Sequence, residues 1–317
     1  MLLYKVFDCG LNSNVALPEL IVAEEAEPLY VFNLHAAQPQ EPVTNHWSRH
    51  VHLHDGREWL SLARQRHGFL LRFHGWADFL ISTGGREIDC YPRTGTDLVT
   101  LSHLLLDQVI PMVLSQRGEL VLHAGAVASR EGAIVFLGET GLGKSTLSAS
   151  FCQQGFALLT DDCLLLRREG QEFRIIPSYP GLRLWSETRV ALSWDTVENA
   201  PVAQYSGKER IKLNRDHLLF CTAPEPVNRL YILAPPTEET GIERVHICPV
   251  RPRDAFMELV KSSFRLDTTD HKSNRKTFER IDEAVNALDI FRLSFPRDMS
   301  FLPSVRAAVL EHMVGGN

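Results

Sequence analysis

Residues 138–145 read GETGLGKS and fit the pattern G-x-x-x-x-G-K-[ST] at every fixed position. Glycines in this stretch allow the backbone to turn so that successive N–H groups face one anion. The apolar run Ala133–Leu137 precedes the stretch, and Leu147–Gln154 is expected to form a helix that Gly155 closes. A strand, a glycine-rich loop and a helix in this order predict a phosphate-binding loop.

A loop of this kind assigns roles to its side chains. Lys144 is expected to reach the β- and γ-phosphates of a nucleoside triphosphate, and Ser145 to ligate Mg²⁺. Thr146 is expected only to support the turn. The alternative, a glycine-rich turn without a ligand, is disfavoured by the strand before the motif and the helix after it. The predicted nucleotide-binding residues are Gly138, Glu139, Thr140, Gly141, Leu142, Gly143, Lys144, Ser145 and Thr146.

Two adjacent carboxylates follow the next expected strand, Phe156–Leu159. Asp161 and Asp162 come only 17 residues after Lys144. A carboxylate at the end of a strand beside a phosphate-binding loop can hold Mg²⁺, and a second one can accept the proton of an attacking hydroxyl. The alternative is an Asp-Asp turn that only solvates the end of the strand. The position just after the loop and its helix favours the functional interpretation.

A histidine ends the expected strand Glu119–His123, which precedes the strand of the glycine motif. If these two strands pair as neighbours, His123 lies at the same edge of the sheet as the phosphates. It could then contact a phosphate or orient the acidic pair. A structural role for His123 is the alternative.

The order of elements around the motif is typical of an α/β nucleotide-binding core, which Cys163–Arg167 continues as a further strand. Before it, short apolar runs predict a mostly β N-terminal lobe, and Thr96-Asp97 is expected to cap a helix that Pro111 kinks or restarts. We therefore expect two domains, 1–117 and 118–317. The strands expected in the lobe are Leu29–Leu34, His50–Leu53, Gly68–Phe73 and Phe79–Ser82, with a hairpin turn at 83–86.

The composition excludes several classes of protein. Of the 317 residues 44% are apolar and 23% are charged, as in globular proteins, and the net charge of −6 argues against a nucleic-acid partner. Six scattered cysteines without a CxxC pair indicate reduced thiols. There is no signal-peptide pattern and no uncharged run of ~18 apolar residues, so we expect a cytoplasmic protein without a membrane partner.

Histidines are frequent in the N-terminal lobe and raise the question of a metal site. Because His50, His52 and His54 alternate, they would share one face of a strand. A surface or structural role is favoured, since no cluster of carboxylates lies nearby in the sequence. The histidines in question are His46, His50, His52, His54, His67 and His74.

Four stretches together resemble the catalytic domain of HPr kinase/phosphorylase: LVLHAGAVA (120–128), GETGLGKSTLSASF (138–151), LLTDD (158–162) and YPGLRLW (179–185). They look most like the HPr-kinase-related proteins of peptide biosynthetic clusters, such as lasso peptide kinases. The nucleotide core is also similar to that of phosphoenolpyruvate carboxykinase. The resemblance covers roughly Glu119–Arg168 and implies the α/β fold of these kinases.

The resemblance implies a kinase that uses ATP and Mg²⁺ to phosphorylate a hydroxyl, with His123 and Lys144 in its catalytic site. It implies that one of Asp161 and Asp162 is the base and the other binds the metal, and of these two arrangements we expect Asp161 as the base and Asp162 on the metal. It also implies a basic loop that closes on the acceptor, for which SGKERIKL (206–213) supplies Lys208, Arg210 and Lys212. Arg183 is a weaker candidate for an acceptor or phosphate contact, with a surface position as the alternative.

The acceptor stays open. A serine in a peptide or protein is the first choice, and the N-terminal lobe is the natural place to recognise it. Free serine is an alternative acceptor, and a nucleotide-gated regulatory ATPase without any acceptor is an alternative from another class. Phosphorylase activity, GTP in place of ATP, and the oligomeric state are also left open.

Overall fold

The described chain forms two compact units. The computed structural model describes residues 1–24, 27–41, 47–53, 55–212, 219–235 and 244–315. Unit 1 consists of Met1–Glu119, Pro201–Gly207 and Phe264–Thr277, and unit 2 of Leu120–Ala200, Lys208–Ser263 and Phe278–Asn317. The first crossing lies close to the boundary expected after residue 117. The two short returns to unit 1 were not expected, because segments of this length leave no trace in composition or periodicity.

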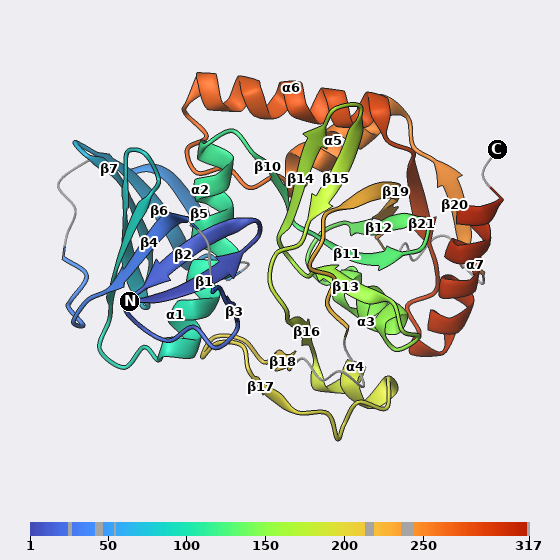
Figure 1. The fold of residues 1–317 in the computed structure, drawn as a ribbon, viewed down its shortest axis with the longest axis horizontal. Coiled ribbons are helices and arrows are strands. Elements are labelled where there is room, and N and C mark those ends of the chain that lie inside the picture. Colours follow the sequence, from blue (N-terminus) through green and yellow to red (C-terminus); the bar gives the residue numbers. More distant parts are fainter. Residues whose placement is uncertain (25–26, 42–46, 54, 213–218, 236–243, 316–317) are drawn as a thin grey trace. The chain divides into compact units, whose positions relative to one another are not determined.

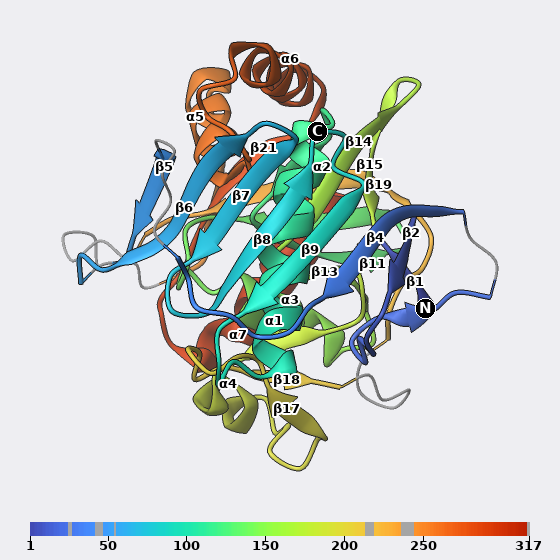
Figure 2. The ribbon, with the colours of Figure 1, turned by 90° about the vertical axis from the view of Figure 1, so that its left-hand side faces the viewer.

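Unit 1 is built on one sheet of nine strands, seen face-on in Figure 2. The hairpin turn expected at 83–86 is present, and it joins β8 to β9 with Gly85 at a φ of 66°. The strands lie in the order β3 (Ile21–Val22), β1 (Leu2–Val6), β2 (Cys9–Ser13), β4 (Pro28–Leu34), β9 (Glu87–Pro92), β8 (Ala77–Ser82), β7 (Gly68–Phe73), β6 (Glu58–Gln65) and β5 (Trp47–His52).

One long helical segment belongs to the same unit. It comprises α1 (Leu98–Leu104), the π-helical turn η1 (Leu105–Val109) and α2 (Ile110–Gln116). As expected, Asp97 caps it, and its carboxylate accepts the N–H of Thr100 at 2.8 Å. Pro111 lies in the first turn of α2. Because proline has no N–H to donate to the preceding turn, the wider π-helical turn before it lets the helix continue.

This segment is long and apolar enough to span a membrane by length and composition alone. Of its most apolar window of 18 residues, 78% is buried inside the structure. Such burial is typical of a core helix in a soluble protein.

Unit 2 contains the second large sheet, so the chain is a mixed α/β protein. Its main path is β10 (Leu120–Leu122), β14 (Leu164–Glu169), β15 (Glu172–Ile176), β19 (Glu225–Leu233), β12 (Gly132–Leu137), β11 (Ala124–Ser129) and β13 (Ala157–Thr160). Two further strands extend it, since β21 (Ile290–Ser294) pairs with β19 and β20 (His246–Pro249) pairs with β21.

Helices cover both faces of this sheet (Figure 1). Along β12, Ile134 and Phe136 pack toward α3 (Lys144–Cys152) and α7 (Leu302–Val314). Ala133, Val135 and Leu137 pack toward α5 (Pro252–Ser262) and α6 (His271–Ala287). A strand buried on both faces is apolar throughout, which is why Ala133–Leu137 could be recognised from the sequence.

A small second sheet completes unit 2. It has the order β16 (Leu182–Leu184), β18 (Glu209–Ile211) and β17 (Asn199–Pro201), and α4 (Ser186–Ala191) follows β16. A 3-10 turn, η2 (Met299–Phe301), precedes α7. None of the strands β11, β16, β17 and β18 was predicted, because they are short or rich in small and polar residues.

The contact between β11 and α3 gives a test of the packing. A Cβ added at Gly125 would lie 2.9 Å from the hydroxyl oxygen of Ser148, which is fully buried on α3. Gly125→Ala should therefore lower the free energy of unfolding by roughly 1–3 kcal/mol, measured by urea denaturation. Adding Ser148→Ala removes the obstructing atom and should recover most of the loss.

Gly84→Ala is the matched control for this prediction, because no atom lies within 4 Å of its added Cβ. If Gly125→Ala proved as stable as Gly84→Ala, the close approach of β11 to α3 would be wrong.

Candidate functional site

Three neighbouring strands of unit 2 bring the expected site residues to one edge of the sheet. β11 lies between β12 and β13 and is antiparallel to both, so β12 and β13 run in the same direction. Their carboxyl ends therefore meet the start of β11 at the same edge, and the register pairs Ala124 with Leu137. Gly138 follows β12, Asp161 follows β13, and His123 precedes β11.

The route by which His123 arrives differs from the expectation. Its own strand, β10, pairs with β14 and not with the strand of the glycine motif. Instead, β11 places His123 beside that motif, because β11 begins at the residue directly after it. The Nε2 atom of His123 lies 3.5 Å from the hydroxyl of Thr140.

The glycine loop, residues 138–143, turns sharply into α3. Gly141 and Gly143 have φ values of 87° and 92°, a left-handed conformation that glycine adopts without strain. α3 begins at Lys144, and no side chain caps its first turn. The positive end of the helix and its first N–H groups are thus available to an anion.

Lys144 is held by the loop itself. It is 4% exposed, and its ammonium donates to the carbonyl oxygens of Gly138 at 2.8 Å and Glu139 at 3.0 Å. Burial lowers the pKa of Lys144, although the charges of Asp162 and Asp161 oppose the change. The side chain is therefore fixed beside the loop, where phosphate oxygens could replace the carbonyl groups.

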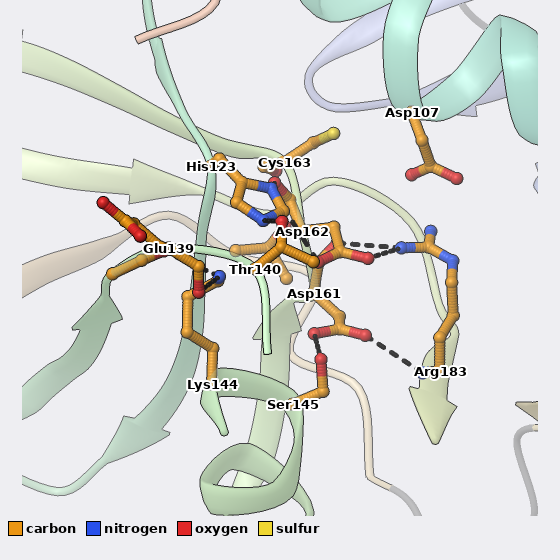
Figure 3. Close-up of polar contacts among 12 residues, drawn as sticks. Asp107, His123, Glu139, Thr140, Lys144, Ser145, Asp161, Asp162, Cys163 and Arg183 are labelled. Atoms are coloured by element: carbon orange, nitrogen blue, oxygen red, sulfur yellow. Dashed lines mark hydrogen bonds and ion pairs between the residues drawn. The ribbon is translucent and has the colours of Figure 1, made fainter. Parts of the chain in front are cut away.

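Asp161 is buried and fully engaged. One carboxylate oxygen accepts the hydroxyl of Ser145 at 2.8 Å, and the other accepts the backbone N–H of Arg183 at 2.9 Å (Figure 3). Burial, and next the charge of Asp162, raise the pKa of Asp161 to about 6. A buried carboxylate that resists ionisation beside a serine hydroxyl offers oxygen ligands of the kind that Mg²⁺ prefers.

Asp162 has the opposite character. Burial opposes its ionisation, but the positive charges around it prevail and hold its pKa well below the usual range; the groups responsible are His123, which is protonated at the acidic pH where a carboxyl group titrates, and Arg183, Lys208 and Lys144. The guanidinium of Arg183 donates to its carboxylate at 2.8 Å. The backbone of Asp162 has a φ of 68°, which is unusual for a residue other than glycine and marks local strain.

His123 connects the loop with the acidic pair. Its Nδ1 lies 3.1 Å from the carbonyl oxygen of Asp162 and 3.8 Å from the carboxylate of the same residue. Burial lowers the pKa of His123, so the neutral ring is favoured at pH 7. In the neutral form, Nδ1–H donates to the carbonyl group, and Nε2 is left as an acceptor facing Thr140.

These residues line one pocket in unit 2. Lys208 of the basic loop and Arg183 of the YPGLRLW stretch, both expected to contact the acceptor or a phosphate, line it as well. Asp161 lies behind the pocket wall. The lining residues are His123, Thr140, Gly141, Gly143, Lys144, Ser145, Thr146, Asp162, Arg183, Leu184, Trp185 and Lys208.

The four basic residues predicted to contact the acceptor or a phosphate occupy different positions. Arg183 is only 1% exposed, so the alternative of a surface position is wrong. Arg210 is buried and pairs through the backbone with Arg183 across β16 and β18. Lys212 forms an ion pair with Glu198 at the surface. Of these, Lys208 and Arg183 are the side chains that reach the pocket.

Three residues at the site were not predicted. The hydroxyl of Tyr179 accepts a hydrogen bond from Arg183, and its ring centroid lies 5.6 Å from the guanidinium carbon. Arg297 donates to the carbonyl oxygen of Leu142 at the tip of the glycine loop. Trp185 lines the pocket although it is 52% exposed. Tyr179 and Trp185 are the first and last residues of the YPGLRLW stretch, and this stretch was the signal in the sequence that could have identified both.

The N-terminal histidines form contacts of another kind. His50 and His74 both approach the hydroxyl of Ser61, at 3.1 and 2.8 Å, and Glu58 lies 3.1 and 3.4 Å from the same two rings. Within the described ranges, no group of three or more His, Cys, Asp or Glu side chains could hold a metal ion. His46 and His54 lie outside the described residues.

Comparison with known proteins gives a similarity of structure. No protein-family model and no curated protein matches the chain. The solved structure of the Hpr(Ser) kinase/phosphatase from Coxiella burnetii is 13% identical, and the match covers 62% of this chain and 97% of that chain with a TM-score of 0.33. The case for the site therefore rests on its own geometry.

Trp185 provides a direct reporter of the pocket. An indole that is half exposed to water and lines the same pocket as Lys144 and Ser145 should change its emission when a charged ligand enters. We expect ATP with Mg²⁺ to change the tryptophan fluorescence of the wild type in a saturable way, and Trp185→Phe to lose the change. Trp194→Phe, which removes a buried tryptophan of unit 2, is the control that should keep it. An unaltered signal in Trp185→Phe would place the ligand elsewhere.

The raised pKa of Asp161 predicts how stability depends on pH. An acid whose folded pKa lies above its unfolded value of about 3.9 binds more protons in the folded state, so stability falls as pH rises from about 4 to above 6. Asp161→Asn has no such proton to lose. At pH 8, the free energy of unfolding of this variant should exceed that of the wild type by on the order of 3 kcal/mol. Below pH 4, where Asp161 keeps its proton in the wild type, removing the carboxyl charge should give no such gain.

Denaturant titrations at several pH values, without added metal, measure this difference. A constant difference between wild type and Asp161→Asn at all pH values would show that Asp161 ionises as freely as in an unfolded chain.

Proposed function

We propose that the protein is a Mg²⁺-dependent kinase of the HPr-kinase type, which transfers the γ-phosphate of ATP to a serine hydroxyl of a peptide or protein in the cytoplasm. The observation that carries the proposal is the convergence of a glycine loop, Lys144 and two unlike carboxylates at one edge of one sheet. A phosphate-binding loop alone would serve many nucleotide-binding proteins. The second carboxylate, exposed to the pocket, is what a hydroxyl acceptor requires.

Ser145 and Asp161 fit a magnesium ion. Both offer hard oxygen atoms, the two side chains are already 2.8 Å apart, and the carboxylate is buried without a full countercharge. When bound, Mg²⁺ would neutralise negative charge that develops on the phosphates during transfer.

This assignment reverses the roles that we expected for the two aspartates from the sequence. Both carboxylate oxygens of Asp161 are occupied, by Ser145 and by the N–H of Arg183, and the residue does not line the pocket. Asp162 lines it. Since a base must first be within reach of the proton it accepts, we assign Asp162 to the acceptor hydroxyl and Asp161 to the metal.

The low pKa of Asp162 is compatible with this role. In a loose transition state the bond to the leaving oxygen is largely broken before the acceptor loses its proton, so the carboxylate mainly orients the hydroxyl. The acceptor oxygen then bonds to the γ-phosphorus, the bond between that phosphorus and the β–γ bridging oxygen breaks, and ADP leaves. The proton of the hydroxyl passes to Asp162.

Cationic groups of the chain stabilise the transferred phosphoryl group. Lys144 follows the glycine loop directly, and Lys208 lines the same pocket, where its charge opposes the rise in the pKa of Asp161 and contributes to the low pKa of Asp162. The first N–H groups of α3 add a fixed partial charge. Arg183 holds the carboxylate of Asp162 in place. The ring of His123 fixes the strained turn at Asp162 by its contact with the carbonyl oxygen of Asp162. Placement and electrostatics are thus the main contributions of the protein.

Transfer of label from γ-labelled ATP tests the proposal. With Mg²⁺ and a panel of serine peptides, HPr and free serine, the wild type should label one class of acceptor. Asp162→Asn should slow the transfer by roughly 10²–10⁴-fold while ATP still binds, because the variant loses the base and not the loop. Asp161→Asn should raise the Mg²⁺ concentration needed. Asp289→Asn, a surface carboxylate of the same unit paired with Arg229, is the control expected to behave as the wild type.

The same assay separates the rival functions. Label on free serine alone would identify a small-molecule kinase. Label released only as inorganic phosphate would indicate a regulatory ATPase, and full transfer by Lys144→Ala would contradict any role of the glycine loop.

A further inference from the structure

Trp185 supplies the apolar surface of the pocket at the glycine loop. Glycines, hydroxyl groups and charged side chains make up most of the lining. Of the two aliphatic or indole side chains among the lining residues, Leu184 is 2% exposed, whereas Trp185 is 52% exposed. An accessible indole beside groups suited to phosphate fits a ligand that carries both phosphates and a flat apolar ring.

The strand before Trp185 explains why the indole faces the pocket. In β16, Leu182 and Leu184 pack in the core that α3 shares. Arg183 points to the opposite face, where its guanidinium reaches Asp162. The backbone of Trp185 is still extended, with φ −70° and ψ 150°, so this residue continues the alternation and shares the face of Arg183. The two leucines therefore fix the side on which the indole lies.

The direction of the same strand separates Trp185 from the acidic pair. Two residues of extended chain span about 6–7 Å, so the Cα of Trp185 lies about that far beyond the Cα of Arg183. Figure 3 shows that β16 runs from Arg183 away from His123. Thr146 of α3 lines the pocket as well. The indole thus belongs to the end of the pocket that is remote from His123.

A bound nucleotide would have a defined direction in this pocket. Under the proposed function, its γ-phosphate lies beside Lys144 and Asp162. A loop of this kind holds the other phosphates with its backbone N–H groups and with the first turn of the helix that follows. Thr146 lies in that turn, which no side chain caps. The nucleoside then extends away from the acidic pair, toward Trp185.

We propose that the indole of Trp185 is the platform on which the nucleobase stacks, so that the site takes a purine nucleoside triphosphate. This role rests on the proposed function for the direction of the triphosphate. Stacking on an aromatic ring responds to the area of the base and not to the groups at its edge. Since purines have the larger ring system, ATP and GTP should bind alike, and CTP and UTP more weakly.

Binding of ATP and of inorganic triphosphate separates this role from a structural one. Measured by isothermal titration calorimetry with Mg²⁺, Trp185→Ala should weaken the binding of ATP by roughly 10- to 100-fold, because it removes the stacking surface. The same variant should bind inorganic triphosphate as the wild type does, because that ligand has no base. Trp185→Phe keeps an aromatic ring and should lose less affinity for ATP.

Val190→Ala is the matched control for these titrations. Val190 lies in α4, directly after Trp185 in the chain, is 65% exposed and does not line the pocket. Its removal should leave the affinity for both ligands unchanged. The wild type gives a second measurement that does not depend on the folding of a variant: ATP and GTP should bind with similar affinity, and CTP and UTP several-fold more weakly.

Equal losses of affinity for ATP and inorganic triphosphate in Trp185→Ala would overturn the base platform, because Trp185 would then only support the loop. Unchanged affinity for ATP would also overturn it, and a raised KM for the acceptor in that variant would place the acceptor on the indole. Binding of CTP as tight as that of ATP would contradict the purine class.

The titrations need no phosphoryl transfer, so the two proposals can fail separately. If the wild type labels no acceptor but Trp185→Ala loses affinity for ATP and not for inorganic triphosphate, the kinase is wrong and the purine site stands. Absence of ATP binding by the wild type would contradict both.

Discussion

Two carboxylates that are adjacent in the chain, Asp161 buried and Asp162 lining the pocket, impose the main constraint on unit 2. Both cannot ionise at low cost unless positive charge surrounds them, and the structure supplies it unequally. Asp162 receives the guanidinium of Arg183, while Asp161 receives only the backbone N–H of that residue and the hydroxyl of Ser145. The pair is therefore split into one ionised carboxylate and one that holds its proton to about pH 6. A bound cation would remove this imbalance.

The sheet explains why these groups meet. An antiparallel strand between two parallel ones brings one strand start and two strand ends to the same edge. Each of these three positions carries a part of the candidate site: His123, the glycine loop and the acidic pair. Small residues make the arrangement possible, since Gly125 in β11 lets α3 approach closely enough for Ser145 to reach Asp161. Topology, close packing and chemistry thus depend on the same short strand.

The sequence predicted these groups better than the way in which they are assembled. The residues from Gly138 to Ser145, the two aspartates and His123 could be identified because each stands at the end of a recognisable apolar run. β11 could not, because Ala124–Ser129 consists largely of alanine, glycine and serine and shows no strand periodicity. The burial of Arg183 depends on contacts between segments far apart in the chain, which no local pattern records. For the same reason, the sequence could not decide which aspartate faces the pocket.

A structure determined with Mg²⁺ and a non-hydrolysable ATP analogue would test the central claim most directly, because it locates the phosphates and the metal relative to the acidic pair. The account predicts the triphosphate along the glycine loop, the metal on Ser145 and Asp161, and the carboxylate of Asp162 facing the open side of the γ-phosphate. A triphosphate bound away from Lys144, or a metal held by Asp162 with Asp161 facing the acceptor side, would contradict it.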